Sequence, residues 1–357
     1  MLSDRVVVAV ACRTHHRLNY ESAGMTQLQV VFYQRKRRPK ANFSLEFIFE
    51  DVRNRLKSSI RSQVCLAPCY SNGLFRRLWI AVDAWFRRGQ VTHVTGDINF
   101  AVILMSRSKS VLTILDCGFL ERTNGLRRWL LHRYWLSLPV RSASCVTTIS
   151  EAAKETIIHN LGFDPGTIVV IPVAVSDSFQ PVSKEFNREC PRILQVGTAS
   201  NKNLERAVEA LQGISCKLVI VGQVNEHVRE LIDRFRINTE NYVNLGSQEI
   251  LQQYVNSDMI LFASTYEGFG MPIMEAQRIG RAVVTSSISS MPEVAGAGAC
   301  FVDPLSVSSI REGILKVIQD DGFRERIIAD GFVNSRRFDA EEIASQYLKI
   351  YKTLAAR

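Results

Sequence analysis

The stretch STYEGFGMPIMEAQRIGRAVV, Ser264–Val284, decides the fold because it joins two strand-like runs through a tight turn and a helix. Gly268 and Gly270 allow the backbone to turn sharply and to approach a ligand closely. Pro272 suits the first position of a helix, and Gly280 is a typical residue just after its end. The stretch therefore predicts a strand, a turn, a helix and a strand, with free N–H groups at the start of the helix that can bind an anion.

The same alternation of strand-like and helical segments continues on both sides of this stretch. Such a pattern is typical of parallel α/β sheets, and a chain of 357 residues favours two domains over one. We expect strands at 28–33, 91–94, 110–116, 145–150, 192–197, 216–222, 241–246, 259–264, 281–286 and 299–304. The sequence predicts two doubly wound α/β domains that face a cleft, with ligands at the carboxyl ends of the strands.

Composition shifts along the chain predict the domain boundaries. We expect residues 1–24 to lie outside the fold, because the first strand-like segment begins after Met25 and initiation there would remove nothing that a core needs. An N-terminal domain follows at 25–175, and a polar, proline-containing linker at 176–191. The C-terminal domain spans 192–338, and a last helix at 339–357 is placed to cross back to the N-terminal domain.

The two halves of the chain carry opposite net charge. Residues 1–150 contain 23 Lys and Arg but 9 Asp and Glu, whereas the remainder contains 21 and 26. A cationic domain favours phosphate-bearing partners, such as anionic lipid headgroups or a phosphorylated substrate. Arginine clusters alone support nucleic-acid binding, and no nucleic-acid motif accompanies them, so we expect no nucleic-acid partner. No apolar run reaches the length of a membrane span.

Two stretches in the first half mix aromatic and basic residues. The segments 73–89 and 121–141 contain all four tryptophans beside pairs of arginines. Basic, tryptophan-bearing amphipathic helices suit a membrane interface, although packed helices with a solvated basic face remain the alternative. The expected membrane contacts are Arg127, Arg128, Trp129, Arg133 and Trp135.

The eight cysteines include no CxxC pair, and Cys65 and Cys69 have no second Cys/His pair at zinc spacing nearby. Reduced, mostly buried thiols in a cytosolic protein are therefore favoured over disulfides or a zinc site. No DxD-like site stands at the end of a predicted strand, so we expect no metal.

Two carboxylates, Glu267 and Glu275, flank the glycine-rich turn. Glu275 lies one turn into the helix, where it can accept hydrogen bonds from a vicinal diol such as a ribose. Glu267 lies in the loop, where it can contact another polyol or a developing positive charge. Acids at this position can also simply complement the helix dipole. The pair together with both glycines and the proline favours a functional site.

Several motifs resemble those of glycosyltransferase family 4, whose members are retaining enzymes. EGFGMPIME resembles the E-x7-E signature of that family, and RAVVTSSISSMPEVAGAGACFVDP and LQVGTASNKNLERAVEAL resemble two further segments. HVTGD, LTILDCGFLER, VTTISEAAKE and VIPVAVSDSF carry a weaker likeness in the first half. The resemblance implies the GT-B fold, two Rossmann-like doubly wound parallel-sheet domains facing a cleft.

The resemblance also implies roles for particular residues. Glu275 would hold the donor ribose, Glu267 and the amides after it would contact the donor sugar and diphosphate, and Lys202 would neutralise the leaving diphosphate. The implied catalytic residues are Glu267, Asp97 and Asp116. The implied donor-binding residues are Gly197, Thr198, Lys202, Gly268, Phe269, Gly270, Met271 and Glu275.

The sequence departs from the family pattern at three places. Asn99 and Leu115 stand near positions where relatives carry histidines, and Asn201 stands where many carry an arginine. His93 lies inside a predicted strand, and we interpret it as a core histidine. Because these histidines are missing, altered donor choice or weakened turnover stays an alternative.

We therefore expect a metal-independent retaining glycosyltransferase without a cofactor. It would move a sugar from a nucleotide-diphosphate sugar to a saccharide or lipid-linked acceptor in cell-surface polysaccharide or glycolipid synthesis. The expected location is the cytoplasm, with peripheral contact to an anionic inner membrane face. The alternatives are a membrane-associated donor-binding protein without turnover and, as a third reading, a sugar-nucleotide epimerase.

Overall fold

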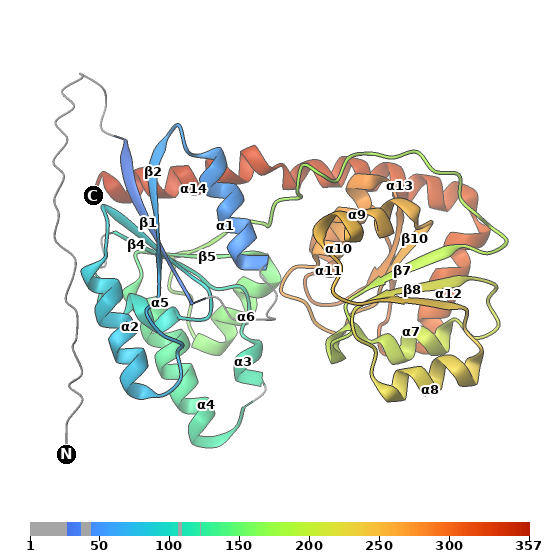
Figure 1. The fold of residues 1–357 in the computed structure, drawn as a ribbon, viewed down its shortest axis with the longest axis horizontal. Coiled ribbons are helices and arrows are strands. Elements are labelled where there is room, and N and C mark those ends of the chain that lie inside the picture. Colours follow the sequence, from blue (N-terminus) through green and yellow to red (C-terminus); the bar gives the residue numbers. More distant parts are fainter. Residues whose placement is uncertain (1–26, 37–43, 106–108, 122) are drawn as a thin grey trace, which may run out of the picture.

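The computed structural model describes residues 27–36, 44–105, 109–121 and 123–357, and it places them in two lobes, each built on a six-stranded parallel sheet (Figure 1). The first sheet has the order β2-β1-β3-β4-β5-β6, and its strands are β1 Leu28–Gln34, β2 Ile60–Leu66, β3 Val91–Thr95, β4 Ser110–Thr113, β5 Cys145–Thr148 and β6 Ile168–Val170. The second has the order β12-β11-β10-β7-β8-β9, with β7 Arg192–Val196, β8 Lys217–Val221, β9 Thr239–Tyr242, β10 Met259–Phe262, β11 Ala282–Ser286 and β12 Cys300–Val302.

Helices cover both faces of each sheet. Those of the first half are α1 Ser44–Arg55, α2 Leu74–Phe86, α3 Gly118–Glu121, α4 Gly125–Leu131, a π-helical turn at His132–Ser137, α5 Leu138–Ser142 and α6 Glu151–Leu161. Those of the second half are α7 Leu204–Ala210, α8 Glu226–Phe235, α9 Ser247–Asn256, α10 Met271–Ile279, α11 Met291–Ala295, α12 Val307–Gln319, α13 Asp321–Ser335 and α14 Ala340–Ala355. The expectation of two doubly wound domains is confirmed.

The strand orders reverse at one point in each sheet, and these points position the site. The chain leaves in opposite directions from β1 and β3 in the first sheet, and from β7 and β10 in the second. A crevice opens outside the carboxyl ends of the strands at such a switch point. Asp97 follows β3, and Glu267 follows β10, so both lie at the edge where a ligand is expected.

The last helix, α14, returns to the first lobe and completes its core (Figure 1). Tyr347 and Tyr351 pack there against Phe32 and Phe49 with almost no exposed surface. Tyr351 Oη lies 2.8 Å from Nδ1 of His93, whose Nε2 lies 2.7 Å from Thr113 Oγ1. Burial lowers the pKa of His93 to about 3, so the ring is neutral near pH 7. Its interpretation as a core histidine is confirmed.

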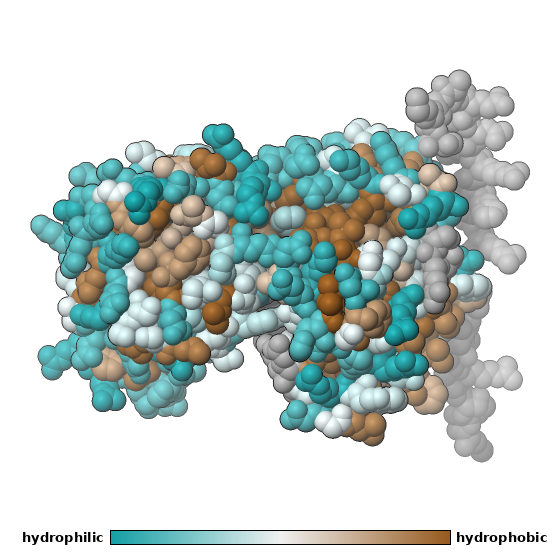
Figure 2. All heavy atoms as spheres, turned by 180° about the vertical axis from the view of Figure 1, so that it is seen from behind, coloured by the Kyte–Doolittle hydropathy of each residue, from teal (hydrophilic) through white to brown (hydrophobic). Residues whose placement is uncertain are grey.

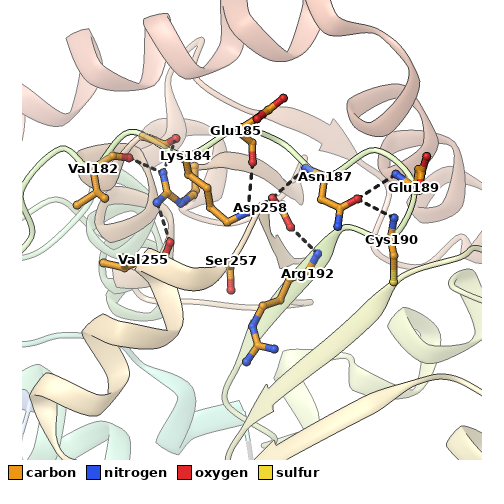
Figure 3. Close-up of polar contacts among 12 residues, drawn as sticks. Val182, Lys184, Glu185, Asn187, Glu189, Cys190, Arg192, Val255, Ser257 and Asp258 are labelled. Atoms are coloured by element: carbon orange, nitrogen blue, oxygen red, sulfur yellow. Dashed lines mark hydrogen bonds and ion pairs between the residues drawn. The ribbon is translucent and has the colours of Figure 1, made fainter.

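The segment expected as a linker, 176–191, is attached to the second lobe by buried charges (Figure 3). Asp258, 5% exposed, pairs with Lys184 and accepts hydrogen bonds from the backbone N–H of Asn187 (3.2 Å) and of Arg192 (2.7 Å). The buried guanidinium of Arg281 donates to the carbonyls of Val182 and Val255, both at 2.8 Å. The segment lacks helix and strand, yet its position is fixed.

The chain crosses between the lobes twice, and the two crossings touch. Val175 N–H donates to the carbonyl of Phe338 at 3.1 Å, which joins the outgoing and returning segments. Arg55 at the end of α1 forms ion pairs with Asp51, Asp177 and Glu341. One guanidinium thus connects the first lobe to both crossings.

Two further points concern the N-terminal residues and membrane spans. The expectation for residues 1–24 lies outside the described residues. Within the described residues, no helix combines the length and the apolar character needed to cross a bilayer.

Candidate functional site

A cleft of about 690 Å³ lies between the two lobes, and side chains from both line it. Figure 2 shows the indentation between the lobes from behind. The first lobe contributes the segments that follow β3 and β4, and the second contributes the loops after β7 and β10. The cleft lining includes Gly96, Asp97, Asn99, Asp116, Asn201, Tyr266, Glu267 and Gly268.

Glu267 is held in the loop after β10 by its backbone. The hydroxyls of Ser289 and Ser290 donate to the Glu267 carbonyl at 2.8 and 2.9 Å, and Ser290 also donates to the carbonyl of Phe269 at 2.7 Å. Ser289 has φ +60°, the left-handed conformation that brings its hydroxyl next to the loop. This support fixes the direction of the Glu267 side chain.

The Glu267 carboxylate pairs with Lys202 in the 3₁₀ turn Ser200–Lys202. Lys202 Nζ lies 2.6 Å from Oε1 of Glu267 and 4.7 Å from the centre of the Phe262 ring. Asn201 Nδ2 donates to the same oxygen at 3.2 Å. Gly197 has φ +91°, and a Cβ there would approach Lys202 Cε to 3.0 Å, so this glycine makes room for the lysine stem.

The loop after β10 also contacts the first lobe through Gly268. Ser150 Oγ donates to the Gly268 carbonyl at 2.7 Å and accepts a hydrogen bond from Ala153 N–H at the start of α6. From α11, the carboxylate of Glu293 accepts hydrogen bonds from the N–H groups of Glu151 (2.9 Å) and Ala152. The first turn of α6 is therefore capped from both lobes.

Glu275 lies on α10, outside the residues that line the cleft, and it accepts a hydrogen bond from Tyr254. The two oxygens, Tyr254 Oη and Glu275 Oε2, are 2.6 Å apart, and Tyr254 is fully buried. Burial raises the pKa of the Glu275 carboxyl, and the hydrogen bond from Tyr254 lowers it in part. Glu275 is thus a fixed acceptor whose charge is costly in this environment.

We expect Tyr254→Phe to raise the pKa of Glu275 further, because the ionised form loses its hydrogen bond. If the Glu275 carboxylate binds the donor, nucleotide affinity falls as pH decreases through that raised pKa, and the midpoint moves upward in the variant. Nucleotide dissociation constants between pH 4.5 and 8 measure the midpoint. Tyr242→Phe in the same lobe is the matched control, and equal midpoints in Tyr254→Phe and the native chain would contradict the role of Tyr254.

The structure brings only part of the expected site together. Asp97, Asp116, Glu267 and Gly268 line the cleft, whereas Gly197, Thr198, Lys202 and Glu275 lie beside it in the second lobe. Gly270 has φ +110° and precedes α10, as expected of a turn glycine, and Met271 is the first residue of that helix.

The structure places two of the expected aromatic residues in packed surroundings. The Phe269 ring is 5% exposed and packs edge-on against Phe338, so this residue can meet a donor only through its backbone. The Trp135 ring lines the cleft and packs on Phe100 with the ring centres 4.8 Å apart, and its membrane contact stays a prediction. Aromatic packing inside the first lobe holds this ring in position.

Sequence reasoning also missed cleft residues. Ser71, Asn72 and Arg77 line the cleft at the start of α2, and Tyr254 and Glu293 support the loops around it. The Pro-Glu-Val motif in the second half pointed to Glu293. Nothing in the neighbouring sequence indicates that its carboxylate binds the start of α6 in the other lobe. Within the part of the chain that is described, no group of three His, Cys, Asp or Glu residues could hold a metal ion. Metal independence stays a prediction.

A known protein family matches the second half of this chain. Residues 177–332 match the family model of glycosyl transferases group 1, and these residues contain Lys202, Glu267 and Glu275. This region belongs to the group 1 glycosyltransferases. The narrower assignment to family 4 stays a prediction.

Relatives and solved structures agree with this family. The O-antigen chain mannosyltransferase B of Escherichia coli is 29% identical over 237 residues, which cover 60% of this chain and 61% of that protein. The phosphatidyl-myo-inositol mannosyltransferase of Mycobacterium tuberculosis is 35% identical over 95 residues, 25% of each chain. This chain therefore spans less than two thirds of these relatives.

The fold matches two glycosyltransferase structures over almost the whole chain. A glycosyltransferase of Rickettsia africae superposes with a TM-score of 0.73 at 18% identity, covering 92% of this chain and 98% of that one. WaaG, a glycosyltransferase involved in lipopolysaccharide biosynthesis, superposes with a TM-score of 0.70 at 14% identity, covering 90% and 99%. The GT-B fold expected from the sequence is confirmed.

Proposed function

We propose that this chain is a retaining glycosyltransferase that moves a mannosyl unit from a nucleoside-diphosphate sugar to a saccharide or lipid-linked acceptor in cell-surface polysaccharide or glycolipid synthesis. The observation that carries the proposal is the Glu267–Lys202 pair at the edge of a cleft between two GT-B lobes. The mannosyltransferase names of the relatives support the choice of sugar.

The chemistry of the second lobe suits the donor. A lysine beside a departing diphosphate stabilises the negative charge that develops as the sugar leaves, and the N-terminus of α10 adds positive potential. Lys202 supplies that cation, and Glu267 holds its ammonium group in place until the diphosphate arrives. Glu275 accepts hydrogen bonds from the donor ribose.

The first lobe presents the acceptor. Asp97 and Asp116 line the cleft opposite Glu267, and Asp116 Oδ1 is oriented by the N–H of Gly118 at 2.9 Å. These carboxylates orient an acceptor hydroxyl toward the donor carbon. The departing phosphate accepts the proton of that hydroxyl, which is consistent with retention of configuration.

A panel of UDP-, GDP-, ADP- and dTDP-sugars tests this proposal. We expect one mannosyl donor to raise the melting temperature and to be hydrolysed slowly, and the released nucleotide identifies the base. If no donor stabilises the protein, the proposal is wrong.

Stabilisation without nucleotide release, even with acceptors added, would favour a donor-binding protein that does not turn over. One observation supports that second candidate. Asn99, which stands near an expected family histidine, is 5% exposed and its amide donates to the Trp135 carbonyl at 2.9 Å. The amide is therefore occupied within the first lobe.

We further propose that the first lobe contacts an anionic membrane at the inner face of the plasma membrane. Helices α2 and α4 expose large apolar side chains next to arginines, a combination that suits the lipid interface. The residues of this α2–α4 surface are Leu74, Phe75, Leu78, Trp79, Leu126 and Trp129, with exposed fractions between 57% and 87%. Seen from behind, hydrophobic residues also lie among hydrophilic ones over the lower part of this lobe (Figure 2).

Charge reversal of Arg127, Arg128 and Arg133 is expected to release the protein from vesicles that contain anionic lipid. Each basic residue near such a surface contributes about 1 kcal/mol, so three reversals weaken binding by well over tenfold. Vesicle co-sedimentation measures the bound fraction. The matched control reverses the exposed Arg229, Arg234 and Arg236 of the second lobe. If the variant with all three first-lobe arginines reversed sediments as this control does, the membrane contact is refuted.

A further inference from the structure

An arginine in the first-lobe wall of the cleft is fixed in place without an anionic partner among the described residues. Arg77 on α2 lines the cleft, and its Nε donates to the carbonyl of Ser71 at 2.9 Å. Its guanidinium carbon lies 4.4 Å from the centre of the Trp135 ring. Among the described residues, no carboxylate pairs with Arg77, so the two terminal nitrogens keep their donors for a ligand.

The ring beneath this guanidinium is itself rigidly held. Trp135 packs against Phe100, its Nε1 donates to the carbonyl of Asp97 at 3.2 Å, and its own carbonyl accepts from Asn99. Stacking on an aromatic face orients the planar guanidinium and reduces the rotamer entropy that is lost when it binds. Arg77 is therefore preorganised for a planar, two-point contact.

Two carboxylates that line the cleft already have cationic partners. Glu267 pairs with Lys202 at 2.6 Å, and Asp97 lies 3.6 Å from the guanidinium of Arg35. A second arginine, Arg127 on α4, lines the same cleft and forms no ion pair with a described carboxylate. Burial lowers the pKa of Arg77, and no carboxylate in the described part of the chain offsets that cost.

We propose that Arg77, together with Arg127, binds a phosphate group of the acceptor. The proposal rests on the proposed function, because it places the acceptor in the first lobe and the donor in the second. Guanidinium forks bind phosphate oxygens in pairs, and such charge-assisted bonds are stronger than neutral ones. The phosphate belongs either to a lipid carrier or to a water-soluble sugar phosphate.

The surroundings of the two arginines favour a lipid carrier. Leu74 and Phe75 at the start of α2 are 76% and 87% exposed, and Leu126, the neighbour of Arg127, is 72% exposed. An apolar chain attached to the bound phosphate can therefore continue along the α2–α4 surface and bury these side chains.

Calorimetric titration of the full chain separates the sources of phosphate. The probes are citronellyl phosphate, which carries a ten-carbon apolar chain, glycerol 1-phosphate, and citronellol as the uncharged control. We expect citronellyl phosphate to bind, citronellol to bind at least tenfold more weakly, and glycerol 1-phosphate to lie between them. Equal affinity for the two phosphates would keep the phosphate site and assign it to a soluble sugar phosphate.

Arginine variants test the residues. Arg77→Gln is expected to weaken citronellyl phosphate binding about tenfold, since two charge-assisted bonds are lost. Arg77→Lys, which keeps the charge but not the fork, restores only part of the affinity, and Arg127→Gln, on an exposed side chain, weakens binding by a few-fold. Arg76→Gln is the matched control, because Arg76 is adjacent on α2 and does not line the cleft.

The proposal is overturned if Arg77→Gln and Arg127→Gln bind the probes as the native chain does, or if Arg76→Gln loses as much affinity as Arg77→Gln. It is also overturned if a saturating nucleotide displaces citronellyl phosphate, because the site would then belong to the donor. The titrations require no turnover and no donor. Failure of the donor panel therefore contradicts the transferase reaction, and failure of the titrations contradicts the phosphate site.

Discussion

Glu267→Gln is expected to lower the rate of sugar transfer by about 10²-fold or more while donor affinity changes by only a few-fold. Glutamine keeps the size of the side chain and its place above Ser289 and Ser290, but it loses the charge that holds Lys202 Nζ at 2.6 Å. An interaction that matters only as charge develops reduces the rate more than binding.

The measurement is the rate of nucleotide release with the donor identified by the panel, together with the donor dissociation constant. Glu205→Gln, an exposed carboxylate on α7, is the matched control and should leave both values unchanged. A Glu267→Gln protein that turns over at the native rate would remove Glu267 from the mechanism. Equal losses in rate and in affinity would instead place it in ground-state binding.

Asp258→Ala is expected to reduce the free energy of unfolding by about 3–5 kcal/mol, a magnitude typical of breaking a buried ion pair. The carboxylate is 5% exposed, and it satisfies Lys184 and the backbone N–H groups of Asn187 and Arg192 (Figure 3). Its removal leaves the backbone N–H groups of Asn187 and Arg192 without their acceptor, and Lys184 loses its carboxylate partner.

Urea unfolding measures the loss. Asp258→Asn keeps one acceptor and should be destabilised less than Asp258→Ala. Glu185→Ala, at an exposed position of the same segment, should stay within about 0.5 kcal/mol of the native chain. If Asp258→Ala has the same urea midpoint as the native chain, the attachment of the 176–191 segment contributes no stability.

The elements around the site could be predicted because residues close in sequence determine them. Helix α10 runs from Met271 to Ile279, one residue earlier than the expected start at Pro272, and Gly280 follows it with φ +89°. Turn glycines, an N-terminal proline and a flanking strand act within a few residues, so one sequence is enough to recognise them. The positions of Glu267 and Glu275 follow from the same rules.

Elements without an apolar pattern were missed. Strand β2 is at the edge of its sheet, and four consecutive residues, Arg61–Val64, are exposed, so it lacks the alternation of buried and exposed residues. Helix α13 was missed because polar residues, Arg324 and Asn334, occupy buried positions on it. Strand β9 was expected at 241–246 but ends at Tyr242, and Asn244 beyond it has a left-handed φ of +60°.

The cleft wall could not be predicted because it depends on contacts between distant segments. Arg77 and Trp135 are 58 positions apart in the sequence, and each alone reads as part of a basic, aromatic helix. Only the packing of α2 against the π-helical turn His132–Ser137 places the guanidinium on the ring. The pairing of Glu293 with the first turn of α6 is equally non-local, because it joins the two lobes.

The return of α14 to the first lobe affects the order in which the protein can be built on a ribosome. Ile343, Ala344, Tyr347, Tyr351 and Leu354 belong to one hydrophobic cluster with β1 and α1. Every residue of the second lobe is translated before these side chains exist, so the nascent first lobe emerges with an open hydrophobic face. The second lobe needs no later segment for its sheet and can fold while translation continues. The N-terminal lobe is therefore translated first, but its hydrophobic core is completed last.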